Sequence, residues 1–178
     1  MLGVMHVAVT AVGRDRPGIA AAVTGVLFDH GANIEDSRMA ILGGHFSMML
    51  IVATDTDPAT LERDLAAATG SLDLTVAVRT VADAASSADT GDAYTLSVYG
   101  ADHPGIVSRV TGTLAERSIN VNDLATRVIG DDPPVYVMIM EVSVPPGVDA
   151  AAFDADLKRL GAELGVDVTL RPAEADTL

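Results

Sequence analysis

The chain begins with a strand pattern that is followed by a helix pattern. Residues 4–11 alternate, with Val7 and Val9 on one face, and this two-residue period predicts a strand. Apolar residues between 19 and 27 then recur at helical spacing behind Pro17, a residue type that suits the first turn of a helix. The same interpretation predicts further strands at 33–41, 45–53 and 72–79 and a helix from Asp57 to Thr69.

The second half of the chain repeats the first. Residues 15–27 (DRPGIAAAVTGVL) and 102–114 (DHPGIVSRVTGTL) are identical at eight of 13 positions, without a gap. The match continues, with Asn33 aligned to Asn120, into the last predicted strand. Such a repeat indicates two copies of one structural unit. The second copy is expected to have strands near 93–100, 119–129, 135–144 and 165–171 and helices near 104–117 and 149–163.

Each copy has the order strand, helix, strand, strand, helix, strand. Two split βαβ units joined by a hairpin are typical of the ferredoxin-like fold, in which helices cover one face of a four-stranded antiparallel sheet. We therefore predict an α+β protein made of two tandem ferredoxin-like βαββαβ domains. Residues 1–81 form the first domain, residues 82–92 a small, polar and acidic linker, and residues 93–178 the second domain with a short acidic C-terminal tail.

The third predicted strand of each copy is apolar on both faces. A sheet that is half exposed to water should be polar on its outer side. The apolar residues on the outer side can be single hydrophobic residues that a protein surface tolerates. Alternatively, another domain or subunit covers this face of the sheet, and we favour this second interpretation. The residues expected toward the helices are Phe46, Met48, Leu50 and Val52, and those expected on the outer face are Met49, Ile51, Val137 and Ile139.

Composition narrows the possible classes of function. The formal net charge is −14 and no segment has a basic stripe, which excludes direct nucleic-acid binding through phosphate neutralisation. The chain has no cysteine, so it has no disulfide or thiol chemistry. No stretch approaches the ~20 apolar residues that span a bilayer. The apolar N-terminus lacks basic residues, so we expect no signal peptide, no membrane contact and a cytoplasmic location.

The histidines and carboxylates do not form a recognisable catalytic pattern. The four histidines lack metal-ligand spacing and are not accompanied by a nucleophile elbow. We therefore expect no metal, no cofactor and no catalytic residue. The histidines are His6, His30, His45 and His103.

The strongest identity between the copies lies between the first strand and the first helix. Both copies read Asp-x-Pro-Gly-Ile, with Gly18 in one and Gly105 in the other. A helix N-terminus offers backbone N–H groups to a carboxylate, and glycine allows a ligand to approach closely. The alternative is that Pro-Gly shapes a tight turn and does nothing more. The residues alone leave both interpretations open.

These motifs resemble the ACT domain family. The resemblance rests on D-R-P-G-I followed by Ala32-Asn33-Ile34, and on D-H-P-G-I followed by Ile119-Asn120-Val121. It covers about 4–81 and 93–172, and a chain with two such units and no other domain resembles the glycine cleavage system transcriptional repressor family. The resemblance implies that an amino acid binds between two modules, where the Pro-Gly turn of one faces the second strand of its neighbour.

Carried over position by position, the resemblance implies two sets of ligand-binding residues. An asparagine can donate and accept hydrogen bonds together, as recognition of a zwitterion requires. His103 stands where the first copy has Arg16, so the second turn lacks a fixed positive charge and the copies can differ in affinity. The implied residues of the first copy are Asp15, Arg16, Pro17, Gly18, Ile19 and Asn33. Those of the second copy are Asp102, His103, Pro104, Gly105, Ile106 and Asn120, with a further contact from Asn122, which aligns with Glu35 of the first copy.

The expected function is regulation without catalysis. The first hypothesis is an amino-acid-sensing protein, with glycine as one possible ligand, that controls amino-acid metabolism or its transcription through contacts with a regulatory partner protein. The alternative is a regulatory subunit that associates with an amino-acid biosynthetic enzyme and has no transcriptional role. A homo-oligomer is expected in both cases. Two ACT-like units occupy nearly all of the chain, so we expect no enzyme activity.

Overall fold

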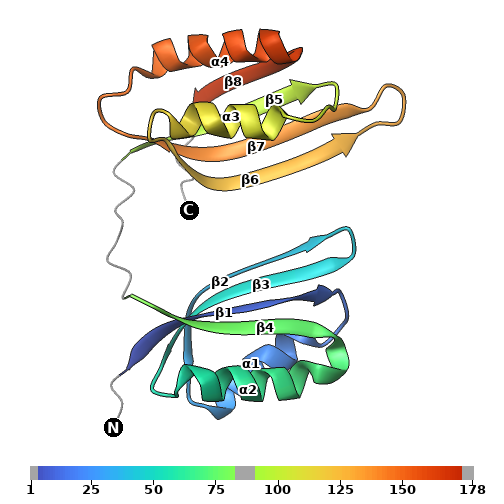
Figure 1. The fold of residues 1–178 in the computed structure, drawn as a ribbon, viewed down its shortest axis with the longest axis vertical. Coiled ribbons are helices and arrows are strands. Elements are labelled where there is room, and N and C mark those ends of the chain that lie inside the picture. Colours follow the sequence, from blue (N-terminus) through green and yellow to red (C-terminus); the bar gives the residue numbers. More distant parts are fainter. Residues whose placement is uncertain (1–3, 83–90, 174–178) are drawn as a thin grey trace. The chain divides into compact units, whose positions relative to one another are not determined.

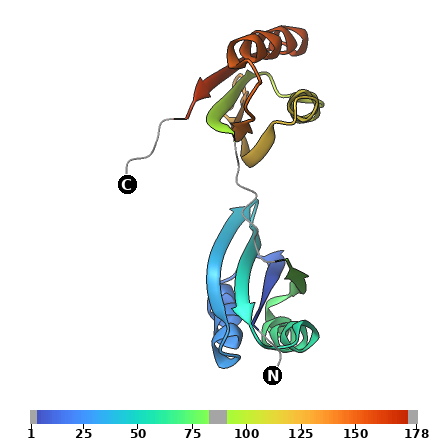
Figure 2. The ribbon, with the colours of Figure 1, turned by 90° about the vertical axis from the view of Figure 1, so that its left-hand side faces the viewer.

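The computed structural model describes residues 4–82 and 91–173 (Figure 1), which form two modules of the same design. In the N-terminal module the strands pair in the order β2-β3-β1-β4, and every pair is antiparallel. Helices α1 and α2 lie together on one face of this sheet (Figure 2). The elements are β1 (Met5–Arg14), α1 (Ile19–Asp29), β2 (Asn33–Leu42), β3 (His45–Thr54), α2 (Pro58–Thr69), a 3-10 turn (Gly70–Leu72) and β4 (Leu74–Val81).

The C-terminal module repeats this arrangement with the strand order β6-β7-β5-β8, again antiparallel throughout. The prediction of two tandem ferredoxin-like βαββαβ domains is therefore confirmed. The predicted linker, 82–92, lies mostly outside the described residues, and its boundaries stay a prediction. The elements are β5 (Asp92–Gly100), α3 (Ile106–Ala115), β6 (Asn120–Ile129), β7 (Val135–Val144), α4 (Ala150–Leu164) and β8 (Val166–Pro172).

Several element boundaries differ from the sequence prediction by a few residues, and two of these differences have a clear local cause. Helix α1 begins at Ile19, so Pro17 lies before the helix and not in its first turn. The fourth strand begins at Leu74, because Gly70–Leu72 continues α2 as a 3-10 turn and Asp73 then adopts a left-handed conformation (φ 56°). Because the apolar alternation already begins at Leu72, the predicted strand started two residues too early, inside this turn.

Each module has its own hydrophobic core between sheet and helices. In β3, Phe46, Met48, Leu50 and Val52 are buried, as predicted, and they pack with Ile19, Val23 and Leu27 of α1 and with Leu61 and Leu65 of α2. In β7 the alternation is the same, and Tyr136, Met138, Met140 and Val142 are buried against α3 and α4. Aliphatic residues dominate both cores, which is why the chain forms two cores with so few aromatic residues.

The outer faces of the two sheets carry the apolar residues expected from the sequence. Met49 and Ile139 are each about half exposed within their modules, whereas Ile51 and Val137 are partly buried. Whether another module or subunit covers these faces stays a prediction.

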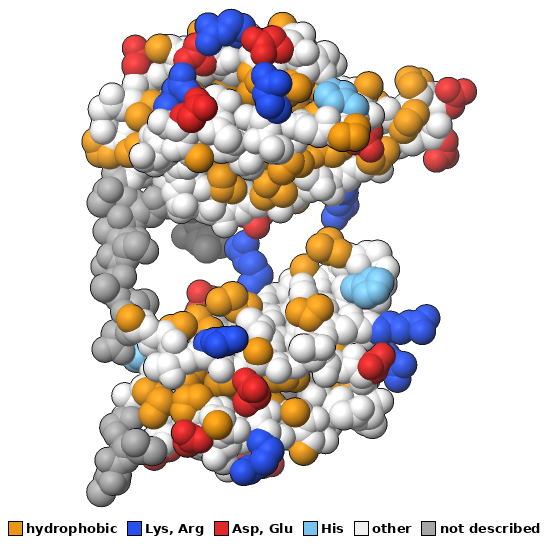
Figure 3. Space-filling view, viewed as in Figure 1, with side chains coloured by type: hydrophobic (Ala, Val, Ile, Leu, Met, Phe, Trp, Pro, Cys, Tyr) orange, Lys and Arg blue, Asp and Glu red, His pale blue; other side chains and the backbone are white. Residues whose placement is uncertain are grey.

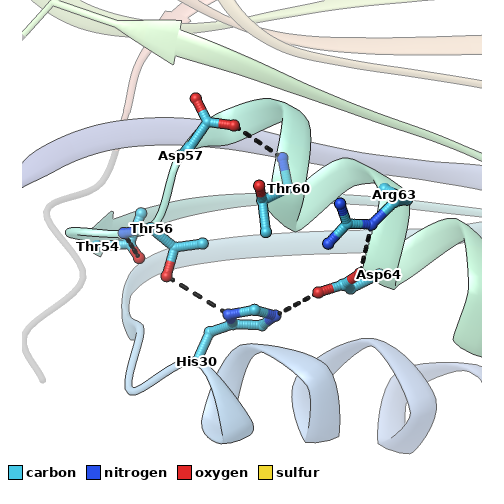
Figure 4. Close-up of polar contacts among 7 residues, drawn as sticks. All are labelled: His30, Thr54, Thr56, Asp57, Thr60, Arg63 and Asp64. Carbon is cyan, nitrogen blue, oxygen red and sulfur yellow. Dashed lines mark hydrogen bonds and ion pairs between the residues drawn. The ribbon is translucent and has the colours of Figure 1, made fainter.

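An ion pair joins the helices at equivalent positions of the two modules. In the first, His30 at the end of α1 lies between Thr56 and Asp64, and its Nε2 is 3.1 Å from the Asp64 carboxylate (Figure 4). In the second, Arg117 pairs with Asp156 and lies over the ring of Phe153. We call these contacts the helix clasps.

Candidate ligand-binding turns

The Pro-Gly pair of each copy forms a tight turn whose geometry requires glycine. Gly18 has φ 94° and ψ −8°, and Gly105 has φ 102° and ψ −13°. These angles match the third residue of a type II turn, which favours proline before it and glycine in place. The backbone conformation therefore agrees with the interpretation that Pro-Gly shapes a tight turn. It does not exclude a ligand, because a Cβ built at either glycine would meet no atom within 4 Å.

The helices that follow these turns begin without a side-chain cap. The N-cap residues of α1 and α3 are Gly18 and Gly105, and neither helix has an acidic residue in its first turn. By contrast, Asp57 caps α2 by accepting from Thr60 N–H, and Asp149 caps α4. The first N–H groups of any helix lack partners within the helix and attract anions. The two motif helices therefore present the open N-termini.

The other motif residues divide between the surface and the core. Asp15 is exposed, and its backbone N–H donates to the carbonyl of Gly44 at 2.9 Å, which fastens the turn to the β2–β3 hairpin. Ile19 and Ile106 are almost fully buried, so their side chains belong to the core and their N–H groups alone face the turn. The motif residues with exposed positions are Asp15, Arg16, Pro17, Gly18, Asp102, Pro104 and Gly105.

His103 points toward its own module. Its Nε2 lies 2.7 Å from the carbonyl of Leu164, at the end of α4, and its Nδ1 lies 3.2 Å from the carbonyl of Pro104. These two carbonyls, Pro104 first, raise the pKa of His103 above its ordinary value, because both ring nitrogens donate only in the imidazolium form. His103 therefore ties the second turn to α4 and is a positioning residue.

The asparagines lie at the far end of the sheet from the turn of their own module. Asn33 pairs with Ala53 of β3, whereas Gly13, just before the turn, pairs with Phe46. Seven residues of β3 separate these positions, or about 23 Å at ~3.3 Å per residue. The structure therefore does not bring Asn33 and the Gly18 turn together within one module, and Asn120 and the Gly105 turn are separated in the same way.

A β-bulge follows each of these asparagines. The register shifts between Ile34 and Asp36 in β2 and between Val121 and Asp123 in β6, so Glu35 and Asn122 are the extra residues. Bulges redirect side chains and are frequent beside functional sites.

The polar contacts at the two bulges are different. Glu35 forms an ion pair with His6 of β1 at 3.1 Å. Asn122 donates to the hydroxyl of Ser143 at 2.6 Å and accepts from the amide of Asn120 at 2.8 Å. One bulge thus carries an acid and an imidazole, and the other carries neutral groups.

Three neighbours of the candidate site could not be identified from the sequence: His6, Ser143 and Leu164. Their contacts join residues that lie 21 to 61 positions apart, and no local pattern indicates such contacts. The bulges did leave a signal. Val121 and Leu124 both pair on the inner side of β7, and their spacing of three instead of two indicates one extra residue.

Other kinds of site find little support in the described residues. Residues 4–82 and 91–173 contain no group of three or more His, Asp or Glu side chains that could hold a metal ion. Within the same ranges no helix is both long and apolar enough to cross a membrane. On the face drawn in Figure 3, acidic and basic side chains are interspersed over the helices of the C-terminal module.

Comparison with known proteins agrees with the geometry of both modules. Residues 5–79 and residues 94–155 each match the ACT domain family. This chain belongs to the ACT domain family. One matched segment lies in each module of the structure, and the second ends within α4. Each segment includes a Pro-Gly turn and the asparagine that begins the following strand.

Relatives that resemble the whole chain also contain both modules. The glycine cleavage system transcriptional repressor of Escherichia coli (strain K12) is 29% identical over 164 residues, which cover 89% of this chain and 85% of that protein. A crystal structure provisionally named as a glycine cleavage system transcriptional repressor superposes with a TM-score of 0.72 at 25% identity, covering 97% of this chain and 99% of the other. An unknown protein from Galdieria sulphuraria gives a TM-score of 0.82 at 28% identity, with 96% and 99% covered.

Proposed function

We propose that this ACT domain protein is a non-catalytic, amino-acid-sensing regulator. The observation that carries the proposal is the uncapped helix N-terminus behind each Pro-Gly turn, present in both ACT modules. Its N–H groups suit the carboxylate of an amino acid, and the positive end of the helix dipole favours the negative charge. The site residues are the Asp15–Ile19 and Asp102–Ile106 turns, with Asn33 or Asn120 supplied by a neighbouring module.

The separation of about 23 Å between turn and asparagine supports a site shared by two modules. An amino acid is far too short to reach both groups within one module. A ligand shared between modules binds one relative placement of them better than another, and it therefore shifts the equilibrium between placements. Such a shift is how ligand binding would reach a partner.

The regulated process is proposed to be amino-acid metabolism, with glycine as the first ligand to test. The similarity to the glycine cleavage system transcriptional repressor supports this choice. The net charge of −14 supports action through a partner protein instead of direct contact with the phosphates of nucleic acid.

Thermal unfolding of the full chain in the presence of each of the twenty amino acids tests the proposal. A ligand that binds only the native state stabilises it by about 2.7 kcal/mol at a hundredfold excess over its Kd. We expect at least one amino acid to raise the Tm, while acetate and ammonium together do not. If none of the twenty raises the Tm, the proposed function is wrong.

A further inference from the structure

The side chain of His103 contacts one peptide group of the second Pro-Gly turn and the end of a helix at the same time. Its Nδ1 lies 3.2 Å from the carbonyl of Pro104, and its Nε2 lies 2.7 Å from the carbonyl of Leu164. Leu164 is the last residue of α4, where the carbonyls lack partners within the helix and a cation is favourable. Since a neutral imidazole has a single N–H, only the imidazolium donates to both carbonyls.

The contact with Pro104 determines which way the Pro104–Gly105 peptide group faces. The C=O and N–H of a trans peptide point in opposite directions, so a carbonyl that faces the His103 ring directs the Gly105 N–H away from the ring. Gly105 is the N-cap residue of α3, and its N–H lies in the turn proposed to bind a ligand. The His103 ring is therefore connected through one peptide group to an N–H of the candidate site.

This peptide group can rotate while the residues on either side stay in place. Gly105 has φ 102° and ψ −13°, as in a type II turn. A type I turn differs by rotation of the central peptide and keeps ψ at about 0° for the same residue. The Gly105 carbonyl accepts from the N–H of Arg109 at 2.9 Å, which holds the following peptide in α3. The Pro104 carbonyl faces His103 in the type II orientation and faces away from it in the type I orientation.

The groups closest to His103 favour its protonated form. The carbonyls of Pro104 and Leu164 raise the pKa of His103, and the negative charge of Asp102 on the same turn acts in the same direction. Tyr136 of β7 lies near enough to Asp102 for that charge to act on its hydroxyl. Burial, more than Asp102, raises the pKa of Tyr136 above its ordinary value of 10.0, so the phenol stays neutral while His103 titrates.

The charged groups on the neighbouring elements are compensated or point elsewhere. Glu163 of α4 forms an ion pair with Arg109 of α3 at 3.0 Å. Asp167 of β8 belongs to the outer face of the sheet, because Val166 and Val168 on either side of it are buried. Among all these side chains, histidine is the type that ordinarily changes its charge near neutral pH.

We propose that protonated His103 locks the Pro104–Gly105 peptide in its type II orientation and that loss of the proton releases this peptide, so that the C-terminal turn presents the Gly105 N–H only while His103 is charged. The lock is complete below the ordinary pKa of histidine and is lost as the pH rises through the raised value. The N-terminal module lacks this control, because Arg16 stands at the equivalent position and a guanidinium keeps its proton. The use of this N–H by a ligand rests on the proposed function, whereas the orientation of the peptide does not.

The peptide orientation is measured by NMR on the full-length chain without any amino acid. In a type II turn the proline ψ of about 120° brings its Hα close to the next N–H, and the ψ of about −30° in a type I turn moves them apart. The nuclear Overhauser effect between Pro104 Hα and Gly105 N–H is therefore strong in the locked turn and weak in the rotated one. The same pair of protons in Pro17 and Gly18 is the internal control, and the ring protons of His103 report its charge.

Between about pH 5 and about pH 8, we expect the Pro104–Gly105 signal to fall at least about twofold relative to the Pro17–Gly18 signal. The midpoint of this fall should coincide with the titration of the His103 ring. If the ratio of the two signals stays constant while the ring titrates, the proposal is wrong.

Two variants test whether His103 itself is the cause. His103→Ala removes both donors and should give the weak Pro104–Gly105 signal even at the acidic end of the range. His103→Arg places the residue type of the first copy in the second turn and should make the signal independent of pH. A strong signal in His103→Ala at acidic pH, or a pH dependence that persists in His103→Arg, overturns the proposal. No ligand enters these measurements, so their outcome is separate from that of the amino-acid screen.

Discussion

The left-handed conformation of Gly18 leads to a measurable cost for any side chain there. Its φ is 94°, a region that L-residues rarely adopt, and a Cβ would have open space around it. The destabilisation by a side chain at this position therefore comes from backbone strain alone, because the added Cβ would not clash with any atom. Placing an L-residue in a left-handed conformation costs roughly 1–2 kcal/mol. We expect Gly18→Ala to reduce the free energy of unfolding of the N-terminal module by about this amount, and Gly105→Ala to do the same in the C-terminal module.

The helices offer matched controls for this prediction. Gly25 in α1 and Gly112 in α3 are exposed, and a Cβ at either would also meet nothing within 4 Å. Neither has a positive φ. Alanine there should stabilise the module by about 1 kcal/mol, because glycine is a poor helix former.

Thermal unfolding followed by circular dichroism separates the two kinds of glycine. For a domain of this size, 1 kcal/mol corresponds to a Tm change of about 4–8 °C. Gly18→Ala should lower the Tm and Gly25→Ala should raise it. If Gly18→Ala unfolds at or above the temperature of the unaltered chain, the turn does not need its glycine and the conformational argument fails. Leucine at Gly18 would suffer the same strain, so its effect on ligand affinity must be judged against its measured stability.

Two further predictions concern the cores and His103. Leu65→Ala and Leu157→Ala remove fully buried side chains at equivalent positions of the two modules. Each should lower the free energy of unfolding, measured by urea denaturation, by about 2–5 kcal/mol. A decrease below about 1 kcal/mol would contradict the presence of a packed core in that module. The pKa of His103 is raised above its ordinary value of 6.5, so its stabilising contribution is complete below that pH and is lost as pH rises through the raised folded pKa. The Tm difference between the unaltered chain and His103→Gln should therefore shrink with rising pH, and a difference that grows would refute the two-carbonyl contact.

The fold was predictable because its signals are local and occur twice. The alternation in 45–53 identified the buried and outer faces of β3, and Asp57 marked the start of α2 as its N-cap. The errors arose where local patterns conflict with geometry. Pro17 suits a helix start, but it also suits the second position of a type II turn, and the glycine after it decided for the turn.

The sequence identifies the residues of the candidate site better than it identifies how they are arranged in space. The Pro-Gly motif is continuous in sequence, so its place before a helix could be identified directly. The distance between Asn33 and the turn follows from the register of β1 and β2 against β3, which depends on strand pairing and not on spacing along the chain. The contact between His103 and Leu164 depends on where α4 ends, and no property of His103 itself indicates it.

The two helix clasps share their acidic partner but differ in the basic one. Asp64 and Asp156 keep the acid at the same place, whereas the base is an imidazole at His30 and a guanidinium at Arg117. A guanidinium offers five N–H donors in a rigid fork and can stack on an aromatic ring, whereas an imidazole has only two ring nitrogens. Arg117 accordingly also reaches the carbonyl of Thr113 and lies over the ring of Phe153, whereas the two ring nitrogens of His30 are taken up by Thr56 and Asp64. The halves of this chain are similar in shape, but exchanging the base alone would not convert one helix clasp into the other.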